Sequence, residues 1–466
     1  MPIASGNEKS PSRPSKSQRG RRQFPNDTNN WAPRFGLAYQ LSKSTVIRSA
    51  YGIFFAPSPT AASGGSAYGY RTDTTFIGSQ DGLRPYHYLR DPFPEGFAPI
   101  VGNSLGLLSS VGGDIASPLR DTVVTYMQNW NLDIQRELPG DILLDVTYVG
   151  TRGLQLSESR ALNQIRPELL AGGPKLLERV GNPFVGLIRS GPLSTPTVPQ
   201  YFLLRPFPQF TDIGVPRASG ASSTYHGFQL KAEKRFSKGL SFLLSYTSSK
   251  LIDDYSIIAV AGRNSERQNT YDRRAERSIS SNEVSQRLVL SYVYDLPFGR
   301  GRSFGAGWNR VADSLLGGWQ INGITTLQTG QPLIISAQDT SFAGGAAFRA
   351  NNNGRSAKLS GPVHERLDRY FDTSVFSQPA PFTLGNVGRT LPDVRGPGTT
   401  NHDFSLFKNF RAREWMTVQF RGEFFNLFNT PAFGFPDQNA NSVQFGRITS
   451  QANAPRQVQF GLKLLF

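Results

Sequence analysis

The chain has 466 residues, a formal net charge of +16 and no cysteine, with 47 glycines, 32 prolines, 33 phenylalanines and only 18% charged residues. No segment has the roughly 18 uninterrupted apolar residues of a membrane-spanning helix, so a helical membrane protein is excluded, whereas a membrane β-barrel is not. The lack of cysteine excludes disulfides, a thiolate nucleophile and cysteine metal sites. The many aromatic and turn-forming residues are typical of an all-β protein.

The first 23 residues, "MPIASGNEKSPSRPSKSQRGRRQ", are rich in serine, proline, lysine and arginine. This composition predicts a disordered basic arm at 1–23. The arm has no apolar core of the kind that a secretory signal needs, so an export signal would have to lie upstream. Its charge raises nucleic acid as a partner, but no helix-turn-helix, zinc-finger or RNP-like pattern accompanies it. We therefore expect no nucleic-acid binding.

From residue 24 onward, segments with alternating apolar and polar residues are bounded by turn residues. In one of them Val146 and Tyr148 alternate with Asp145 and Thr147. Successive side chains of a strand point to opposite faces, so this pattern predicts strands with one apolar and one polar face. The predicted strands are 32–41, 45–55, 121–137, 141–150, 223–236, 239–250, 283–296, 317–328, 401–410, 414–427 and 456–466.

The connections between these strands alternate in length. Short ones near 42–45, 139–140, 237–239 and 411–413, and a medium one at 297–316, alternate with long ones at 56–120, 151–222, 251–282, 329–400 and 428–455. An outer-membrane barrel has this asymmetry, with short periplasmic turns and long extracellular loops. A soluble sandwich has no reason to sort its loops in this way. The pattern therefore favours an antiparallel transmembrane β-barrel.

Aromatic residues gather near the ends of several predicted strands. Tyrosine and tryptophan at the two membrane interfaces form girdles that anchor membrane barrels. We expect such a role for Tyr51, Phe54, Phe55, Tyr292, Tyr294, Phe424, Phe425 and Phe428.

The last predicted strand is apolar at every second position up to the final residue. If this strand closes a barrel, its outer face must meet lipid, which explains an apolar terminus. The ending also resembles the C-terminal signature of outer-membrane proteins, which implies recognition by the barrel-assembly machinery. The residues concerned are Val458, Phe460, Leu462, Leu464 and Phe466.

Catalytic and metal-binding patterns are weak. Gly301–Gly305 matches G-x-S-x-G, but it lies in a glycine-rich connection, which predicts a turn and not a nucleophile elbow. The four histidines are isolated, so we expect neither a metal nor a catalytic role for them. Asp253 and Asp254 begin a long loop, where they could contact a cation or a ligand but are more typical of solvated turns. We expect no enzyme activity and no cofactor.

Four stretches resemble the Oar-like subgroup of TonB-dependent outer-membrane transporters: "FPNDTNNWAPRFGLAYQLSKSTVIRSAYGIFF" (24–55), "QNWNLDIQRELPGDILLDVTYVGTRGLQL" (128–156), "YHGFQLKAEKRFSKGLSFLLSYTSSKLIDD" (225–254) and "FRGEFFNLFNTPAFG" (420–434). The resemblance implies a 22-stranded barrel in the outer membrane of a Gram-negative-type bacterium, with a plug domain and a TonB-contacting segment. It implies ligand uptake driven through TonB.

The resemblance also implies which polar side chains face the lumen, where they would hydrogen-bond the plug and water. These lumen-facing candidates are Gln229, Lys231, Glu233, Arg235, Gln419, Arg421 and Glu423.

The sequence departs from this family in lacking a plug, a TonB-contacting segment and a signal peptide. With the C-terminus in the periplasm, strand 32–41 would start outside the cell, whereas bacterial barrels have an even strand number. We therefore expect 24–466 to be the C-terminal part of a larger barrel, in contact with outer-membrane lipid and coupled to TonB only through a missing plug. A surface adhesin or structural barrel and a soluble secreted β-rich binding protein stay open, as does the ligand.

Overall fold

The computed structural model describes residues 28–56, 70, 74, 76, 78–79, 83–94, 96–116, 123–188, 191–256, 266–413 and 415–466. The predicted basic arm at 1–23 lies outside these residues. The described chain is all-β and dominated by one large sheet, in which every pairing between long strands is antiparallel. Within the described part, no helix is long and apolar enough to cross a membrane.

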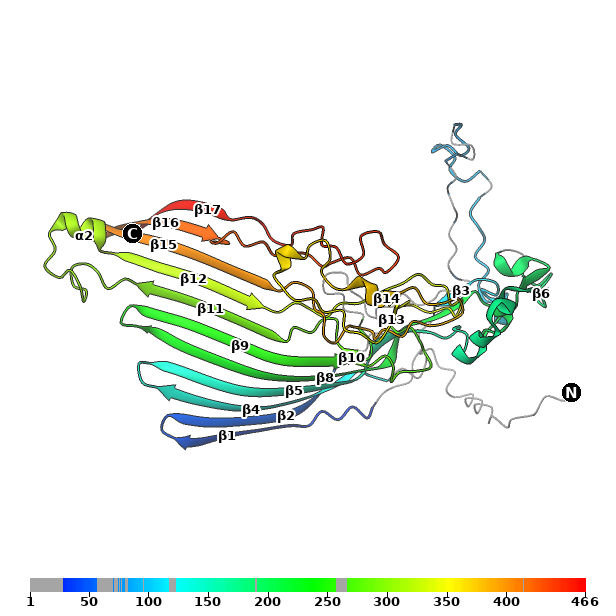
Figure 1. Cartoon of the computed structure of the whole chain (residues 1–466), viewed down its shortest axis with the longest axis horizontal. Helices are drawn as coiled ribbons and strands as arrows, with labels where there is room; N and C mark the ends of the chain where they lie inside the picture. The colour runs from blue at the N-terminus through cyan, green and yellow to red at the C-terminus, as the bar shows by residue number, and fades with distance from the viewer. Residues whose placement is uncertain are drawn as a thin grey trace.

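Eleven long strands form the path of the sheet, in the order β1-β2-β4-β5-β8-β9-β11-β12-β15-β16-β17. Each strand pairs with its neighbours along the chain, and Figure 1 shows them side by side as one curved layer. Their bounds are β1 Arg34–Ser42, β2 Thr45–Phe55, β4 Tyr126–Leu138, β5 Ile142–Ala161, β8 Asp212–Ser237, β9 Leu240–Asp253, β11 Gln286–Asp295, β12 Trp319–Gln328, β15 Thr399–Arg413, β16 Met416–Phe425 and β17 Gln457–Leu465.

Short and long connections leave opposite ends of the sheet. The tight turns after β1, β4 and β8 lie at the left of Figure 1, together with the C-terminus, whereas the long loops gather at the right. The medium connection between β11 and β12 carries the helix α2 (Arg310–Leu316), which Asn309 caps by accepting a hydrogen bond from the amide of Ala312. The predicted alternation of loop lengths is therefore confirmed.

The strand register sorts side chains onto two faces. Val458 of β17 lies opposite Phe424 of β16, which in turn lies opposite Phe404 of β15. One residue further along, Gln459 lies opposite Glu423. Directly opposed residues share a face, so apolar rows and polar rows alternate across the sheet. We call these two surfaces the apolar face and the polar face.

The predicted aromatic positions divide between the two faces. Tyr292 and Tyr294 lie in the same rows as Phe242 and Leu240, on the apolar face. Phe425, however, lies opposite Gln457, on the polar face. Phe54 is on the polar face as well, because it is in phase with Arg48, which lies opposite Asp133. The girdle prediction is therefore wrong for Phe54 and Phe425, since consecutive residues of a strand cannot both point to one side.

The long loops build a second layer with its own core. The largest buried apolar cluster includes Leu333, Ile335, Phe371 and Val394, all from the connection between β12 and β15, and it also takes in Ile448 from the loop before β17. By contrast, most apolar side chains on the long strands are only partly buried. We call this folded region of long connections the loop layer.

Short elements complete the loop layer. Two small pairs are antiparallel, β6 with β7 and β13 with β14, whereas β3 pairs in parallel with β8 and β10 extends the sheet beside β9. Their bounds are β3 Asp114–Ala116, β6 Arg179–Gly181, β7 Thr197–Pro199, β10 Ser278–Ile279, β13 Asn351–Asn352, β14 Phe376–Ser377 and α1 Gln200–Leu203. Single 3₁₀ turns or short runs of them lie at Gly106–Leu108, Pro167–Leu177, Pro192–Ser194, Val363–Glu365 and Thr373–Val375.

Candidate functional site

A hollow of about 630 Å³ lies on the polar face and spans β8, β9, β11, β12, β15 and β16. Glu233 and Arg235 line it on the β8 side, and Asp403 lines it on the β15 side. Between them, Ser291 and Asn322 present a hydroxyl and an amide from β11 and β12. Leu243, Val293 and Ile324 line it as well, so the hollow combines charge of both signs with apolar side chains, which suits a solute that has polar and apolar parts.

Among the four predicted polar residues of β8, Lys231 and Gln229 lie beside residues of β5, Glu233 pairs with Lys231 on its own strand, and Arg235 lines the hollow. The Lys231 ammonium is 2.8 Å from a Glu233 carboxylate oxygen and 4.0 Å from that of Asp145 on β5. Gln229 lies opposite Thr147 of β5, whose hydroxyl donates to Asp133 of β4 at 2.7 Å. Polar side chains of β4, β5 and β8 therefore lie side by side in two successive rows of the polar face.

The three predicted residues of β16 form a separate group on the same face. The Nε of Arg421 donates to Gln419 at 2.7 Å, and the amide of Gln419 donates to Asn409 of β15 at 2.9 Å. Glu423 lies opposite Ser405, which lines the hollow. Four strands separate this group from that of β8, so the structure brings Glu233 and Arg235 into the hollow and leaves the β16 group at its edge.

Asp403, Asn322 and Ser291 are residues of the hollow that the sequence interpretation missed. A signal existed for Asp403, because it alternates with His402 and Phe404 in "NHDFSLF" and so belongs to the polar phase of its strand. No such signal existed for the hollow that residues of β8 and β15 both line, because it depends on the curvature of the whole sheet.

Where the long-loop end of the sheet meets the loop layer, a buried network of ion pairs begins at Asp253 and Asp254. Asp253 pairs with the buried Arg389, and Asp254 lies 2.8 Å from Arg273 and 3.5 Å from Arg267. Both side chains are at most 7% exposed. The interpretation of these residues as solvated turn formers is therefore wrong, because both are enclosed and neutralised by arginines.

Further ion pairs join distant loops in the same network. Arg349 pairs with Glu276, whose other carboxylate oxygen accepts the backbone amides of Gln268 and Asn269 at 3.0 Å. Burial lowers the pKa of Arg349, and the charge of Glu276 opposes that effect. The network thereby fixes the connection between β9 and β11 to the connection between β12 and β15.

The pKa of Asp254 shows how the network balances charge. Burial opposes ionisation of this carboxyl, but the hydrogen bonds from the Ser222 amide and from Arg273, with the charges of Arg267 and Arg273, outweigh it. The pKa of Asp254 therefore lies below its ordinary value. The ionised carboxylate of Asp254 is therefore stabilised by its own chain, and its role is structural.

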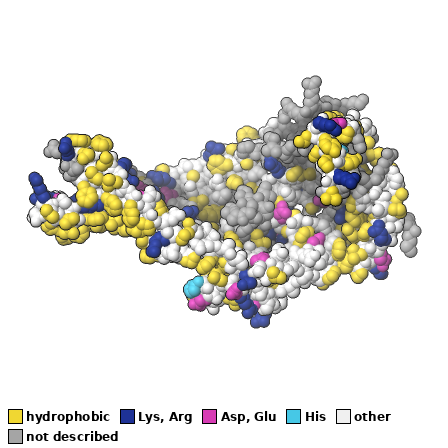
Figure 2. All heavy atoms as spheres, turned by 90° about the horizontal axis from the view of Figure 1, so that it is seen from above, with side chains coloured by type: hydrophobic (Ala, Val, Ile, Leu, Met, Phe, Trp, Pro, Cys, Tyr) yellow, Lys and Arg dark blue, Asp and Glu magenta, His cyan; other side chains and the backbone are white. Residues whose placement is uncertain are grey.

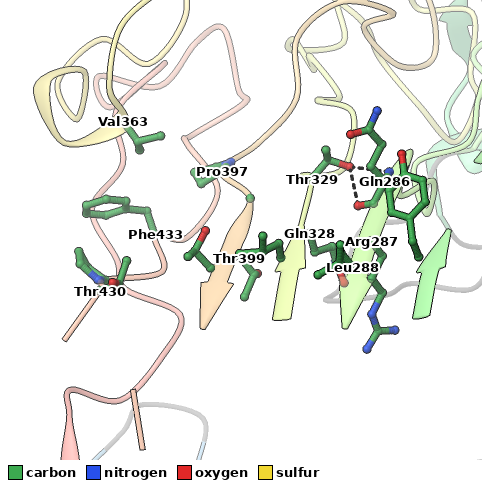
Figure 3. Close-up of a pocket in the computed structure, with 15 residues that line it drawn as sticks. Gln286, Arg287, Leu288, Gln328, Thr329, Val363, Pro397, Thr399, Thr430 and Phe433 are labelled. Carbon is green, nitrogen blue, oxygen red and sulfur yellow. Dashed lines mark hydrogen bonds between the residues drawn. The ribbon is translucent and has the colours of Figure 1, made fainter. Parts of the chain in front are cut away.

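A cleft of about 580 Å³ lies where the apolar face meets the loop layer (Figure 3). On the sheet side its wall includes the row formed by Tyr246, Leu288, Leu327 and Thr400 of β9, β11, β12 and β15. Figure 3 shows Val363 and Phe433 facing this wall from the loops, while the Arg287 guanidinium points away from them.

The remaining candidates have structural roles in the described chain. Gly301–Gly305 forms part of a turn in which the amide of Phe304 donates to the carbonyl of Pro297. His402 lies 3.0 Å from the Thr325 hydroxyl and contacts Phe428. Among the residues that the structure describes, no group of three or more His, Cys, Asp or Glu side chains is placed to hold a metal ion.

The last strand presents its predicted apolar residues at the surface. The exposed fraction is 71% for Leu462 and 85% for Phe466. In Figure 2 apolar side chains gather at the left, over the end of the molecule that carries the tight turns and lies away from the loop layer. Their recognition by an assembly machinery stays a prediction. The full set, Val458, Phe460, Leu462, Leu464 and Phe466, is exposed.

Comparison with known proteins adds a family. The family model described as "Outer membrane beta barrel domain" matches residues 4–459. No curated protein matches the sequence.

Solved structures that are similar to the chain have low sequence identity to it. The outer membrane transporter YddB from Escherichia coli is 8% identical with a TM-score of 0.42, and the match covers 93% of this chain and 40% of YddB. The ferripyoverdine receptor of Pseudomonas aeruginosa is 10% identical with a TM-score of 0.37, and the match covers 93% of this chain and 32% of the receptor. The ferric citrate transporter FecA is 9% identical with a TM-score of 0.37, and the match covers 93% of this chain and 38% of FecA. The chain spans about a third to two fifths of the length of these structures.

Proposed function

The chain belongs to the outer membrane beta-barrel domain family, and on this premise we propose that it forms the barrel of an Oar-like TonB-dependent transporter that takes up a ligand across the bacterial outer membrane. The protein is an outer-membrane β-barrel protein, and its apolar face suits lipid. The observation that carries the transport proposal is the hollow on the opposite, polar face, which Glu233, Arg235 and Asp403 line.

The polar face is the one that we propose lines the lumen. Water or a polar solute there would find Lys231, Gln419 and Glu423 in addition to the hollow, because all belong to polar rows of the register. The loop layer covers the extracellular end, since long loops of outer-membrane barrels lie outside the cell. A ligand would therefore contact the loop layer first and the hollow afterwards.

Two partners belong to the same proposal. The assembly machinery would read the apolar alternation of β17, whose side chains are exposed at the edge of the sheet. Coupling to TonB would require a plug domain encoded outside 24–466, because the sequence resemblance supports only barrel segments. No contact with TonB by the barrel itself is needed in this scheme.

The test uses the source bacterium, with the gene deleted and then restored at full length. Cells would be given a defined mixture of ferric siderophores, oligopeptides and oligosaccharides, and depletion of each compound would be followed by mass spectrometry. We expect depletion of one class to be lost on deletion, restored by the gene and abolished by an uncoupler. A variant with E233Q, R235Q and D403N should deplete that class more slowly.

A matched control is K463Q, which also removes a charge from the polar face but lies on β17, outside the hollow. It should behave as the wild type does. Unchanged depletion of every compound after deletion, combined with lost attachment of cells to surfaces, would contradict transport and support the adhesin alternative.

A further inference from the structure

Three exposed cations surround Thr224 on the apolar face, at its long-loop end. Arg152 of β5 lies opposite Thr224 of β8 in the register. The Nη2 of Arg277 is 3.4 Å from the Thr224 hydroxyl, and Lys250 of β9 lies opposite His226, two residues from Thr224. All three cations are exposed. We call Arg152, Lys250 and Arg277 the Thr224 patch.

A row of rings lies directly inward of this patch on the same face. Trp130 is in the same row as His226, and the centroids of their rings are 6.2 Å apart. Gly150 lies between them, and a Cβ at this position would be 2.1 Å from the Trp130 ring. The Tyr148 hydroxyl lies 2.7 Å from Nδ1 of His226. The close approach of Trp130 to the backbone therefore depends on glycine at 150.

Further inward, Leu132, the ring of Tyr148 and Phe228 form an apolar stretch of one row, with Ser49 and Ser248 on either side of it. Going outward, the surface changes from apolar to aromatic to cationic. Successive rows on one face are about 7 Å apart along a strand, which is comparable to the depth of one headgroup region of a bilayer. When the aromatic row lies at the interface, the Thr224 patch lies at the level of the lipid headgroups.

The charges of the Thr224 patch are not neutralised from within. In the part of the chain that the structure describes, none of its three cations forms an ion pair, whereas the neighbouring Arg273 pairs with Asp254. Two lysines at the opposite end of the apolar face are engaged by their own chain. Lys234 donates to the Ser237 hydroxyl at 2.7 Å, and the buried Lys408 donates to the carbonyl of Gly317.

We infer that the Thr224 patch binds the phosphate of a phosphorylated, acylated glycolipid in the outer leaflet, with an acyl chain against Tyr148 and Phe228. Arginine matches phosphate geometry through paired N–H donors, and exposed cations at a membrane surface attract anionic headgroups. The surface is continuous with the face that meets lipid, so a lipid is the occupant that its surroundings favour. The inference rests on the outer-membrane location and not on transport.

The test uses the full chain purified from outer membranes in detergent and analysed by native mass spectrometry. Three probes are compared: diphosphorylated lipid A, the same lipid after removal of its phosphates, and inorganic phosphate. The wild type should retain diphosphorylated lipid A, and the variant R152Q/K250Q/R277Q should need about tenfold or more of the lipid for equal retention. Retention by the wild type should also fall as salt is raised, because exposed charges are screened.

The matched control variant is K43Q/R136Q/K463Q, which removes the same charge from exposed positions outside the patch. It should retain lipid A as the wild type does, and heat-modifiable migration on gels shows that each variant is folded. Three results would overturn the inference: equal retention of lipid A by the patch variant, equal retention of the dephosphorylated lipid by the wild type, or binding of inorganic phosphate with no preference for the lipid.

Discussion

Arg389 is the most completely enclosed cation of the loop layer, with a side chain only 1% exposed. It pairs with Asp253, and its Nε donates to the carbonyl of Glu276 at 2.9 Å. Removing one partner of a buried pair leaves the other charge without compensation, at a cost of about 3–5 kcal/mol. Arg389→Ala should therefore loosen the loop layer and accelerate its cleavage in limited proteolysis of the membrane-embedded protein.

The control for this prediction is Arg369→Ala. Arg369 pairs with Asp372, but the two side chains are 57% and 24% exposed. Water replaces the lost partner at such a site, so the cleavage rate should stay close to that of the wild type. Equal acceleration by both variants would show that the buried network does not hold the loops together.

Asp254 gives the loop layer a dependence on pH. Because the folded pKa of this carboxyl lies below the ordinary value of 3.8, its contribution to stability is complete above that value and is lost as the pH falls through the folded pKa. Asp254→Asn should therefore raise hydrogen exchange of the loop amides at pH 7, and the difference from the wild type should shrink as the pH drops below 3.8. Asp368→Asn, at an exposed ion pair, controls for the loss of one charge.

At the scale of the element, β17 separates the two faces most clearly. Leu462 lies opposite Phe420 on the apolar face, whereas Gln459 lies opposite Glu423 on the polar face. An arginine on the lipid side of a barrel costs about 2–4 kcal/mol near the bilayer midplane. Leu462→Arg should therefore lower the heat-modifiable fraction in outer membranes, and Gln459→Arg should leave it nearly unchanged. The opposite order of the two variants would reverse the assignment of the faces.

The strands that the sequence predicted best are those in which alternation and a tight turn coincide. The predicted segment 45–55 has the same bounds as β2, because "SKST" marks its start. The prediction failed at the first half of β8, where "DIGVPRASGAS" has no alternation. That half is extended because it pairs with the outer part of β5 and with β3. Such support comes from residues far away in the sequence and leaves no local pattern.

For the candidate site, the sequence predicts which face a polar side chain is on, but not which strands come together around it. The phase of each strand places Gln229, Lys231 and Glu233 on one face without any structure, because the period of a strand is two. The hollow itself and the neutralisation of Asp253 were not predictable. Both depend on contacts such as that between Asp253 and Arg389, which are 136 residues apart in the chain.

For the molecule as a whole, we place the apolar face of the sheet against lipid and its polar face against water. The chain has no cysteine, so single cysteines can be introduced and spin-labelled one at a time along β9 in the full-length protein in lipid. The sheet assigns Phe242, Leu244 and Tyr246 to the apolar face and Ser245 and Thr247 to the polar face.

The most direct measurement is the collision rate of these spin labels with oxygen, which partitions into lipid, and with a water-soluble nickel chelate. If the apolar face meets lipid, the two rates should alternate with a period of two residues and in opposite phase, with collisions with oxygen favoured at 242, 244 and 246. High accessibility to the nickel chelate at every position, or alternation in the reverse phase, would contradict this placement of the faces.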